Sequence, residues 1–153
     1  MIRFCIPGEP QGKGRPRVGR VGQHVRMFTP TKTAAYEGLV AHAAQAAMAG
    51  RDLLQGACSI DLDVVCAVPA SWSKRKTSDA LHGLIRPTKK PDADNVLKAV
   101  CDGINGVVWH DDTQAVDVTL RKRYGPVPGV WVWVREVPAA PVHEQAELLE
   151  VAA

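Results

Sequence analysis

Residues 90 to 98 read Lys-Pro-Asp-Ala-Asp-Asn-Val-Leu-Lys, and a second acidic pair, Asp111 and Asp112, follows later in the chain. The residues in between are apolar at helical spacing up to Ile104, after which Asn-Gly can end a helix. The stretch therefore predicts a helix that begins at its aspartates. Two close carboxylates, a lysine one turn later and another carboxylate from elsewhere are typical of divalent metal and phosphodiester chemistry.

These charged residues also have ordinary structural explanations. Asp92 or Asp94 can cap the helix N-terminus, although capping does not account for both of them and Asp112. Asp94, Lys98 and Asp102 are spaced i, i+4 and i+8 on one helix face, where exposed charge pairs contribute little. Salt bridging on the helix surface is therefore a serious alternative for Asp102 and a weaker one for Lys98.

The composition sets the class of protein. The chain has 153 residues, 46% of them hydrophobic, which fits one compact domain. No apolar run approaches the ~20 residues that cross a bilayer, and the N-terminus lacks the features of a signal peptide, so we expect a cytoplasmic protein without a membrane partner. The four cysteines have no CxxC spacing and are expected to be buried, reduced thiols.

Basic residues are concentrated in two parts of the chain. Between Glu9 and Glu37 there are six cations and no acid, and a second block from Lys74 to Lys90 contains one acid, Asp79. Clustered Lys and Arg neutralise phosphates and release counterions, so the blocks predict a polyanionic partner, with solubility alone as the alternative. The cations expected to contact phosphates are Lys13, Arg15, Arg17, Arg20, Lys74, Arg75, Lys76, Lys89 and Lys90.

The periodicity of apolar residues predicts an α+β fold in which a small sheet packs with two main helices. We expect the last two strands to form a hairpin around the Gly-Pro-Val-Pro-Gly turn at residues 125–129. The expected helices are residues 33–49 and the run that starts at residue 92, and the expected strands are residues 1–6, 58–66, 116–120 and 130–134.

Two segments lack a sustained period. Residues 8–30 are rich in Gly, Pro and Arg and are expected to form a mobile loop or a loose hairpin. Residues 67–91 are expected to form a long, flexible loop, and loops of that length in compact domains are usually functional. Residues 137–153 form an Ala- and Glu-rich tail to which we assign no function, so that residues 1–136 make up the expected domain.

Residues 90–98 and 102–114 closely resemble the central signature of the RusA-type Holliday junction resolvases, small endodeoxyribonucleases of bacteria and their prophages. The opening residues 7–17, Pro-Gly-Glu-Pro-Gln-Gly-Lys-Gly-Arg-Pro-Arg, and residues 28–37 resemble the phage-like branch of that family. The likeness covers roughly residues 2–136.

The resemblance implies a mixed α/β homodimer that binds a four-way DNA junction and nicks two symmetric strands in the presence of Mg²⁺ or Mn²⁺. The family's catalytic aspartates fall on Asp92, Asp94 and Asp112, and its important lysine falls on Lys98. We expect the aspartates to hold one or two metal ions and Lys98 to stabilise charge on the phosphate. Two further candidates at family positions are Asp111 and Asp102.

Two other functions remain open from the sequence. A protein that binds junctions or duplexes without cutting them would explain the basic blocks, but it would gain nothing from carboxylates that face DNA. A metal-dependent phosphohydrolase of small nucleotides would explain the carboxylates, but it would leave both basic blocks without a role.

Overall fold

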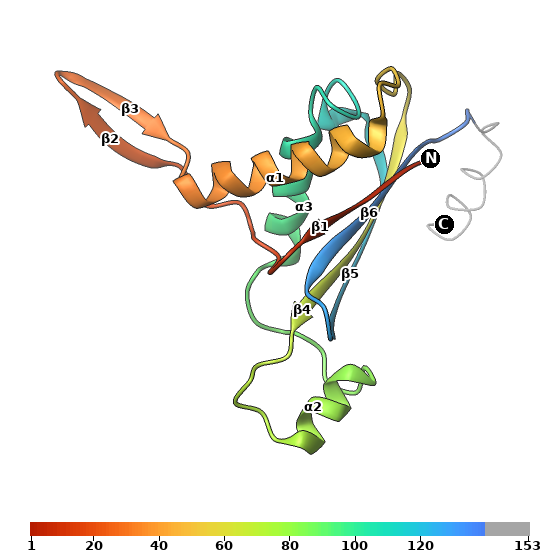
Figure 1. Ribbon diagram of the computed structural model, residues 1–153. Helices are drawn as coiled ribbons and strands as arrows, with labels where there is room; N and C mark the ends of the chain where they lie inside the picture. Colours follow the sequence, from red (N-terminus) through yellow and green to blue (C-terminus); the bar gives the residue numbers. More distant parts are fainter. Residues whose placement is uncertain (140–153) are drawn as a thin grey trace, which may run out of the picture.

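The computed structural model describes residues 1–139 and shows a mixed four-stranded sheet with two helices on one face (Figure 1). The strands lie in the order β1-β6-β4-β5. β6 pairs antiparallel with both β1 and β4, whereas β4 and β5 are parallel. The expected α+β class with a small mixed sheet is confirmed. The strands are β1 (Ile2–Pro7), β4 (Cys58–Ala67), β5 (Ala115–Gly125) and β6 (Gly129–Glu136).

The core lies between this sheet and the helices α1 (Thr31–Met48) and α3 (Ala93–Ile104). Ile60 and Leu62 of β4 are fully buried in the core because alternate strand residues point to the same face. On the opposite face of β4, Asp63 accepts hydrogen bonds from the Arg123 guanidinium. The two main helices expected from the sequence are present as α1 and α3. The strand expected at residues 58–66 is present as β4.

The two helices approach closely where Gly103 of α3 meets Val40 of α1. A Cβ atom built on Gly103 would lie 2.7 Å from the Cβ of Val40, which is closer than real carbon atoms pack. Val40 is fully buried and Gly103 is also buried. The absence of a side chain at position 103 thus allows α3 to pack against α1.

The expected hairpin of the last two strands is wrong, because β4 lies between β5 and β6. The connection between Gly125 and Gly129 passes the end of β4, and it must span two strand spacings, about 10 Å, rather than one. Its two prolines cannot donate to a strand ladder, which suits a connection of this kind. β4 has the longest buried apolar run, and the sheet places it between two neighbours.

The expected flexible loop at residues 67–91 is also wrong in part, since it contains the helix α2 (Lys74–Leu81). The Ser73 hydroxyl caps this helix by accepting a hydrogen bond from the Lys76 amide. The preceding Trp72 packs edge-on against Tyr124 of β5, with 5.3 Å between the ring centroids. The helix is short and buries one residue, Ala80, so its apolar period is too weak to see in the sequence.

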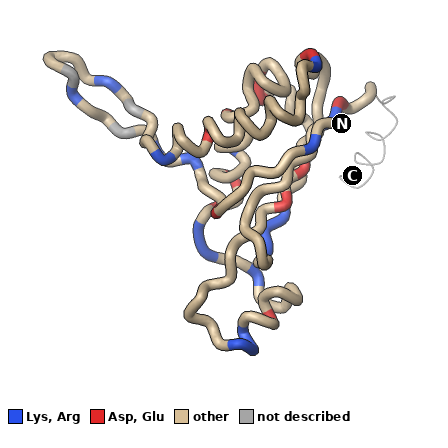
Figure 2. The backbone as a smooth tube through the Cα atoms, in the orientation of Figure 1, with Lys and Arg blue, Asp and Glu red and all other residues tan. Residues whose placement is uncertain are grey.

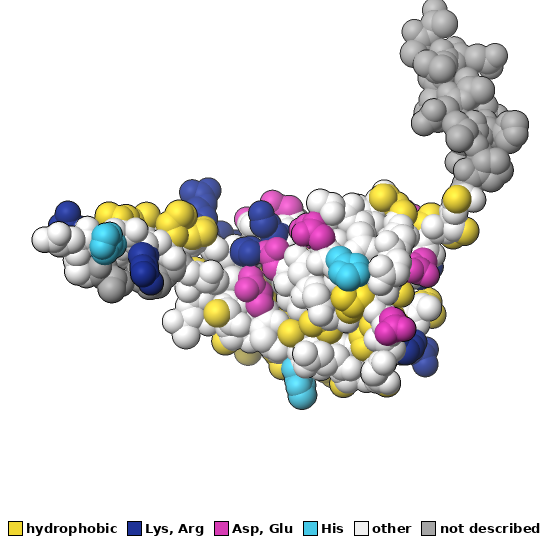
Figure 3. All heavy atoms as spheres, turned by 90° about the horizontal axis from the view of Figure 1, so that it is seen from above, with side chains coloured by type: hydrophobic (Ala, Val, Ile, Leu, Met, Phe, Trp, Pro, Cys, Tyr) yellow, Lys and Arg dark blue, Asp and Glu magenta, His cyan; other side chains and the backbone are white. Residues whose placement is uncertain are grey.

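Residues 17–28 form a hairpin, the second of the two forms expected for the N-terminal segment. Its strands are β2 (Arg17–Val21) and β3 (His24–Phe28), joined by a two-residue turn in which Gly22 has a φ of +63°. The hairpin projects beyond the start of α1 (Figures 1 and 3) and carries basic residues on both strands (Figure 2).

Three smaller expectations have different outcomes. Cys58, Cys66 and Cys101 are buried free thiols as expected, but Cys5 is exposed, because it lies on the uncovered face of the sheet. Most of the tail, from residue 140 onward, lies outside the described residues. None of the helices within residues 1–139 has the length and apolar character to cross a membrane.

The α1–α3 contact predicts opposite effects for two helical glycines. Gly103→Ala should lower the free energy of unfolding by about 1–3 kcal/mol because its methyl group overlaps Val40. Gly38→Ala, in an open position on α1, should raise it by up to about 1 kcal/mol through helix propensity. Urea unfolding of both variants measures the difference. Equal midpoints for Gly103→Ala and the unchanged protein would contradict the close packing.

Candidate active site

The predicted catalytic aspartates of the first motif lie at the N-terminus of α3. Asp92 occupies the N-cap position, and its carbonyl accepts the hydrogen bond of the Val96 amide at 3.1 Å. Within the described chain its carboxylate makes no capping hydrogen bond to the helix backbone, and the side chain of Asn95 donates to it weakly at 3.5 Å. Asp94 follows in the first turn, and both aspartates are exposed. Capping therefore does not explain either carboxylate, and both face solvent.

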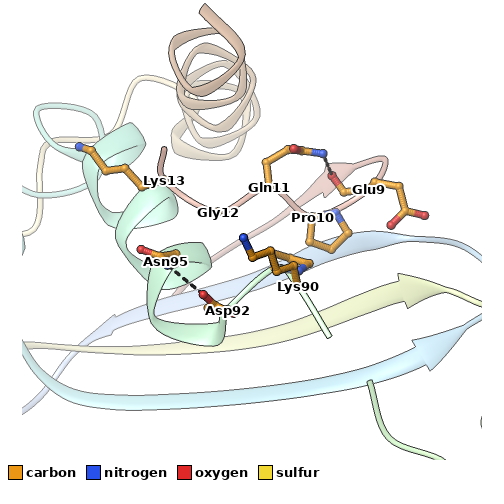
Figure 4. Close-up of a pocket in the computed structure, with 9 residues that line it drawn as sticks. Glu9, Pro10, Gln11, Gly12, Lys13, Lys90, Asp92 and Asn95 are labelled. Carbon is orange, nitrogen blue, oxygen red and sulfur yellow. Dashed lines mark hydrogen bonds between the residues drawn. The ribbon is translucent and has the colours of Figure 1, made fainter. Parts of the chain in front are cut away.

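A pocket of about 430 Å³ opens beside Asp92. Figure 4 shows Asp92 and Lys90 on one side of it, and Glu9 and Gln11 on the other. The second side belongs to residues 9–14, which we call the N-terminal strap. A neighbouring pocket of about 390 Å³ is lined by part of the strap together with Lys98 of α3. The strap therefore runs past two of the predicted catalytic residues.

Backbone contacts hold the strap against both helices. The Lys13 amide donates to the Asn95 carbonyl of α3 at 2.9 Å. The Gly14 amide donates to the hydroxyl of the buried Thr33 of α1 at 3.0 Å. A Cβ on Gly12 would lie 3.0 Å from the Cβ of Asn95, so glycine permits this approach. The glycines of the Gly-Lys-Gly motif thus have a packing role at the site.

The Lys13 side chain adds an ion pair to these contacts. Its ammonium pairs with Asp102 of α3 and lies 3.4 Å from a carboxylate oxygen of Glu37 of α1. The hydrogen bond to Asp102 raises the pKa of Lys13. Figure 4 shows the Lys13 side chain running away from Asp92. A phosphate contact by Lys13 remains a prediction, but the structure gives this lysine a bridging role between α1 and α3.

The same ion pair accounts for Asp102. The alternative considered from the sequence was a pair between Asp102 and Lys98 on the surface of α3. Among the described residues Asp102 pairs with Lys13 instead, across 89 positions of sequence. Lys98 is exposed and takes part in none of the ion pairs found between residues 1 and 139. Its ammonium group is therefore available to another anion.

The second acidic pair lies at a short 3₁₀ turn, residues 112–114. The Asp111 carboxylate caps this turn by accepting from the Thr113 amide at 3.0 Å, and this bond lowers the pKa of Asp111. Gln114 fixes the turn from the other side, because its side chain donates to the carbonyls of Leu54 and Gly56. Asp111 therefore has a structural role, whereas Asp112 does not contribute its carboxylate to the cap.

Asp112 lies near the second half of α3. Burial, with a smaller contribution from the Asp112 charge, raises the pKa of the Cys101 thiol to about 12. Cys101 is seven residues beyond Asp94, which corresponds to about 10 Å along a helix axis. Within residues 1–139 no three His, Cys, Asp or Glu side chains converge as a metal-ligand group. The aspartates belong to one helix region, but the described structure does not gather them around one point.

Lys122 is a supporting residue that the sequence analysis missed. Its ammonium donates to the carbonyls of Lys89 and Pro91 at 2.7 and 2.9 Å, which fixes the segment entering α3. The side chains of Lys89 and Lys90 remain exposed. The alternation of side chains along this strand could have indicated the role of Lys122 from the sequence. It places Lys122 on the core-facing side of β5 together with Leu120.

Other predicted cations are spread around this helix end. Figure 2 shows basic residues on the hairpin, on α2 and on the segment that leads into α3. Arg15, Arg20 and the three cations at the start of α2 are exposed, and the Lys76 ammonium lies 4.0 Å from the centroid of the Trp72 ring. The site thus combines exposed carboxylates on one helix with exposed cations on several elements, which are features of a phosphate-handling, nucleic-acid-binding protein.

Comparison with known proteins identifies the family. Residues 7–135 match the family Endodeoxyribonuclease RusA, which covers nearly all of the described chain. A Bacillus subtilis (strain 168) protein named "Uncharacterized protein YqaN" is 39% identical over 140 residues, spanning 90% of this chain and 98% of that protein. The chain belongs to the RusA endodeoxyribonuclease family, a family of nucleases. The resemblance seen in the sequence motifs is confirmed.

The bridging role of Lys13 can be measured as a coupling energy. Lys13→Met should lower the free energy of unfolding by about 1.5–3 kcal/mol, because it leaves two half-buried carboxylates without their cation. Combined with Asp102→Asn in a double-mutant cycle, it should show a coupling of about 0.5–3 kcal/mol. Additive effects of the two substitutions would contradict the bridge. Arg123→Met is the matched control on the other face of the sheet and should cost about 1 kcal/mol or less.

Proposed function

We propose that this chain is a Holliday junction resolvase, an endonuclease that binds four-way DNA junctions and nicks two matching strands. Membership of the RusA family supports this proposal. It is also supported by the exposed carboxylates at the start of α3, which do not cap the helix. Resolution in DNA recombination and repair is the corresponding role in the cell. The predicted cytoplasmic location fits that role and stays a prediction.

The proposed catalytic residues are Asp92, Asp94, Asp112 and Lys98. Lys98 supports the reaction by offering an exposed ammonium beside the strap, where it can stabilise the negative charge that develops on a phosphate. The exposed carboxylates of Asp92 and Asp94 would hold a divalent cation, which would supply Lewis acidity at the phosphate. Asp111 and Asp102 act through structure, the first as a cap and the second as the partner of Lys13.

The donor chemistry of the aspartates fits Mg²⁺, with Mn²⁺ as a substitute. Mg²⁺ takes oxygen ligands, keeps several of its waters and commonly uses one or two carboxylates together with substrate phosphate. A three-residue ligand group, which the described residues do not form, is thus not required for binding. A divalent ion, when bound, would supply Lewis acidity at the scissile phosphate.

The proposed DNA contacts come from separate elements. The α2 cations and the hairpin cations lie at different ends of the molecule in Figure 2, with the start of α3 between them. A branched substrate presents phosphates in several directions, and such a spread of cations suits it better than it suits a free nucleotide. The proposed contacts are Lys13, Arg15, Arg17, Arg20, Lys74, Arg75, Lys76, Lys89 and Lys90.

A homodimer completes the proposal. A four-way junction is two-fold symmetric, so a dimer with the same symmetry places one acidic site at each of two matching strands. Light scattering on the purified protein, alone and with junction DNA, measures the number of chains. Two chains per junction are expected, and one chain per junction would require a different explanation for paired cuts.

The first experiment compares a labelled four-way junction with a linear duplex of the same sequence, each with and without Mg²⁺. Paired nicks are expected in the junction alone and with metal. Asp94→Asn should slow nicking by about 100-fold or more because it removes one carboxylate of the proposed cation site, while junction binding is retained. Asp117→Asn, an exposed aspartate of β5, is the control and should cut at the normal rate.

Other results would change the proposal. Binding without nicking, across several junction sequences and both metals, would support a DNA-binding protein without catalysis. Hydrolysis of free nucleotides without activity on DNA would support a phosphohydrolase. Full cleavage by Asp94→Asn at saturating Mg²⁺ would remove Asp94 from the site.

The α2 contacts are tested by the salt dependence of binding. Lys74→Ala with Arg75→Ala should weaken junction binding and reduce the slope of log K against log salt by about 2, because about one counterion is released per phosphate contact. Arg3→Ala with Arg121→Ala removes two exposed cations of the uncovered sheet face and should leave the slope unchanged. Equal slopes for the α2 variant and the unchanged protein would exclude α2 from the interface.

A further inference from the structure

The hairpin exposes an apolar face that the proposed function does not use. The strand pairing sets Val18 opposite Met27 and Arg20 opposite Val25, so these four side chains share one face. Val18 and Met27 are each 70% exposed and Val25 is 64% exposed. Three large apolar side chains displayed together on a projecting element indicate a binding surface rather than a core.

The charge around this face indicates the kind of partner. The chain has no acidic residue between Glu9 and Glu37, so every charged side chain of the hairpin is basic. Figure 3 shows hydrophobic and basic side chains on the visible side of the hairpin, without an acidic one. Arg20 lies on the apolar face, and Arg26 lies on the opposite face beside Gly19. A polyanion with apolar groups between its charges complements this arrangement, and duplex DNA is such a partner.

The dimensions of the hairpin also fit a duplex. Each strand has five residues, which corresponds to about 17 Å of extended chain. The major groove of B-DNA is about 12 Å wide and admits a two-stranded ribbon. The two-residue turn at Gly22 and Gln23 keeps the tip narrow.

We propose that the hairpin enters the major groove of one duplex arm and places its Val18–Met27 face against the base edges. Apolar side chains contact thymine methyl groups there, and Arg20 and Arg26 reach bases or phosphates at the sides. This inference rests on the proposed function and names the part of the substrate that the hairpin contacts. It assigns to the hairpin a contact with bases in addition to phosphate neutralisation.

The position of the hairpin gives this contact a consequence for cutting. The strap leads directly into β2, and the strap is hydrogen-bonded to Asn95 at the start of α3. A duplex arm held by the hairpin is therefore kept at a defined distance from Asp92 and Asp94. The geometry of the hairpin thereby helps to select which phosphate reaches the acidic helix end.

Paired substitutions separate apolar contact from charge. Val18→Ser with Met27→Ser should weaken junction binding by about tenfold, from the loss of two buried apolar contacts, with the salt slope unchanged. Arg20→Ala with Arg26→Ala should reduce that slope by about 2. The control Leu84→Ser with Val127→Ser removes two equally exposed apolar side chains elsewhere and should bind normally. None of these exposed positions belongs to the core, and thermal unfolding of each variant checks its fold.

Crosslinking locates the hairpin on the DNA. The exposed Cys5 is first removed as Cys5→Ser, and a photoreactive group is then attached through Gln23→Cys at the hairpin tip. Binding is carried out without metal so that the junction stays intact. Crosslinks should map to one region of a duplex arm and should be reduced in the Val18→Ser, Met27→Ser background at the same protein concentration. The same group attached through Gln45→Cys, on the exposed side of α1, is the positional control.

The outcomes distinguish this inference from the proposed function. If the unchanged protein binds and nicks junctions but the tip does not crosslink to DNA, the hairpin inference is wrong and the resolvase proposal stands. Normal affinity of the Val18→Ser, Met27→Ser variant would also overturn the inference. If the unchanged protein fails to bind any junction, the proposed function itself is wrong.

Discussion

The packing of α3 against α1 and the sheet is the constraint on which the rest of the site depends. The buried side of α3 includes Val96, Val100 and Ile104, each with no exposed surface, and Gly103 allows α1 to come close. One helix thereby fixes three parts of the site at once. Its start carries the two exposed aspartates, its first turn binds the strap, and its second half contains Cys101, whose pKa the Asp112 charge helps to raise.

The contacts around this helix are mostly non-local. Lys13 and Asp102 are 89 residues apart, and Lys122 holds a backbone segment more than thirty residues before it. Both lysines form contacts within the protein itself. Lys13 bridges α1 and α3, and Lys122 anchors the segment that enters α3. The proposed DNA contacts that are not engaged in this way include cations on the hairpin, on α2 and at Lys89 and Lys90.

The sequence was sufficient where structure follows from local pattern. The strand β4 alternates, α3 has a marked apolar stripe and α1 is an alanine-rich run that ends before Gly50, and the Asp92–Lys98 motif lies at the start of α3 as predicted. The failures have physical reasons. β5 and β6 are neighbours in sequence, and both show alternating apolar and polar residues. They do not pair with each other because β4 lies between them, and no local sequence pattern encodes that position of β4. Helix α2 depends on the Ser73 cap and on Trp72 packing against Tyr124, which is a tertiary contact.

The site itself divides in the same way. Its first aspartates could be placed because a helix start fixes both of them, whereas the position of Asp112 depends on a turn whose Gln114 side chain is hydrogen-bonded to the distant loop at Leu54 and Gly56. The family resemblance implied catalytic roles for Asp92, Asp94 and Asp112 and left the roles of Asp111 and Asp102 open. Asp111 and Asp102 are engaged within the fold, and Asp92 and Asp94 extend into solvent. Exposed carboxylates repel a phosphate backbone, so attraction to DNA has to come from cations placed on other elements, and this separation allows binding and cutting to be altered independently.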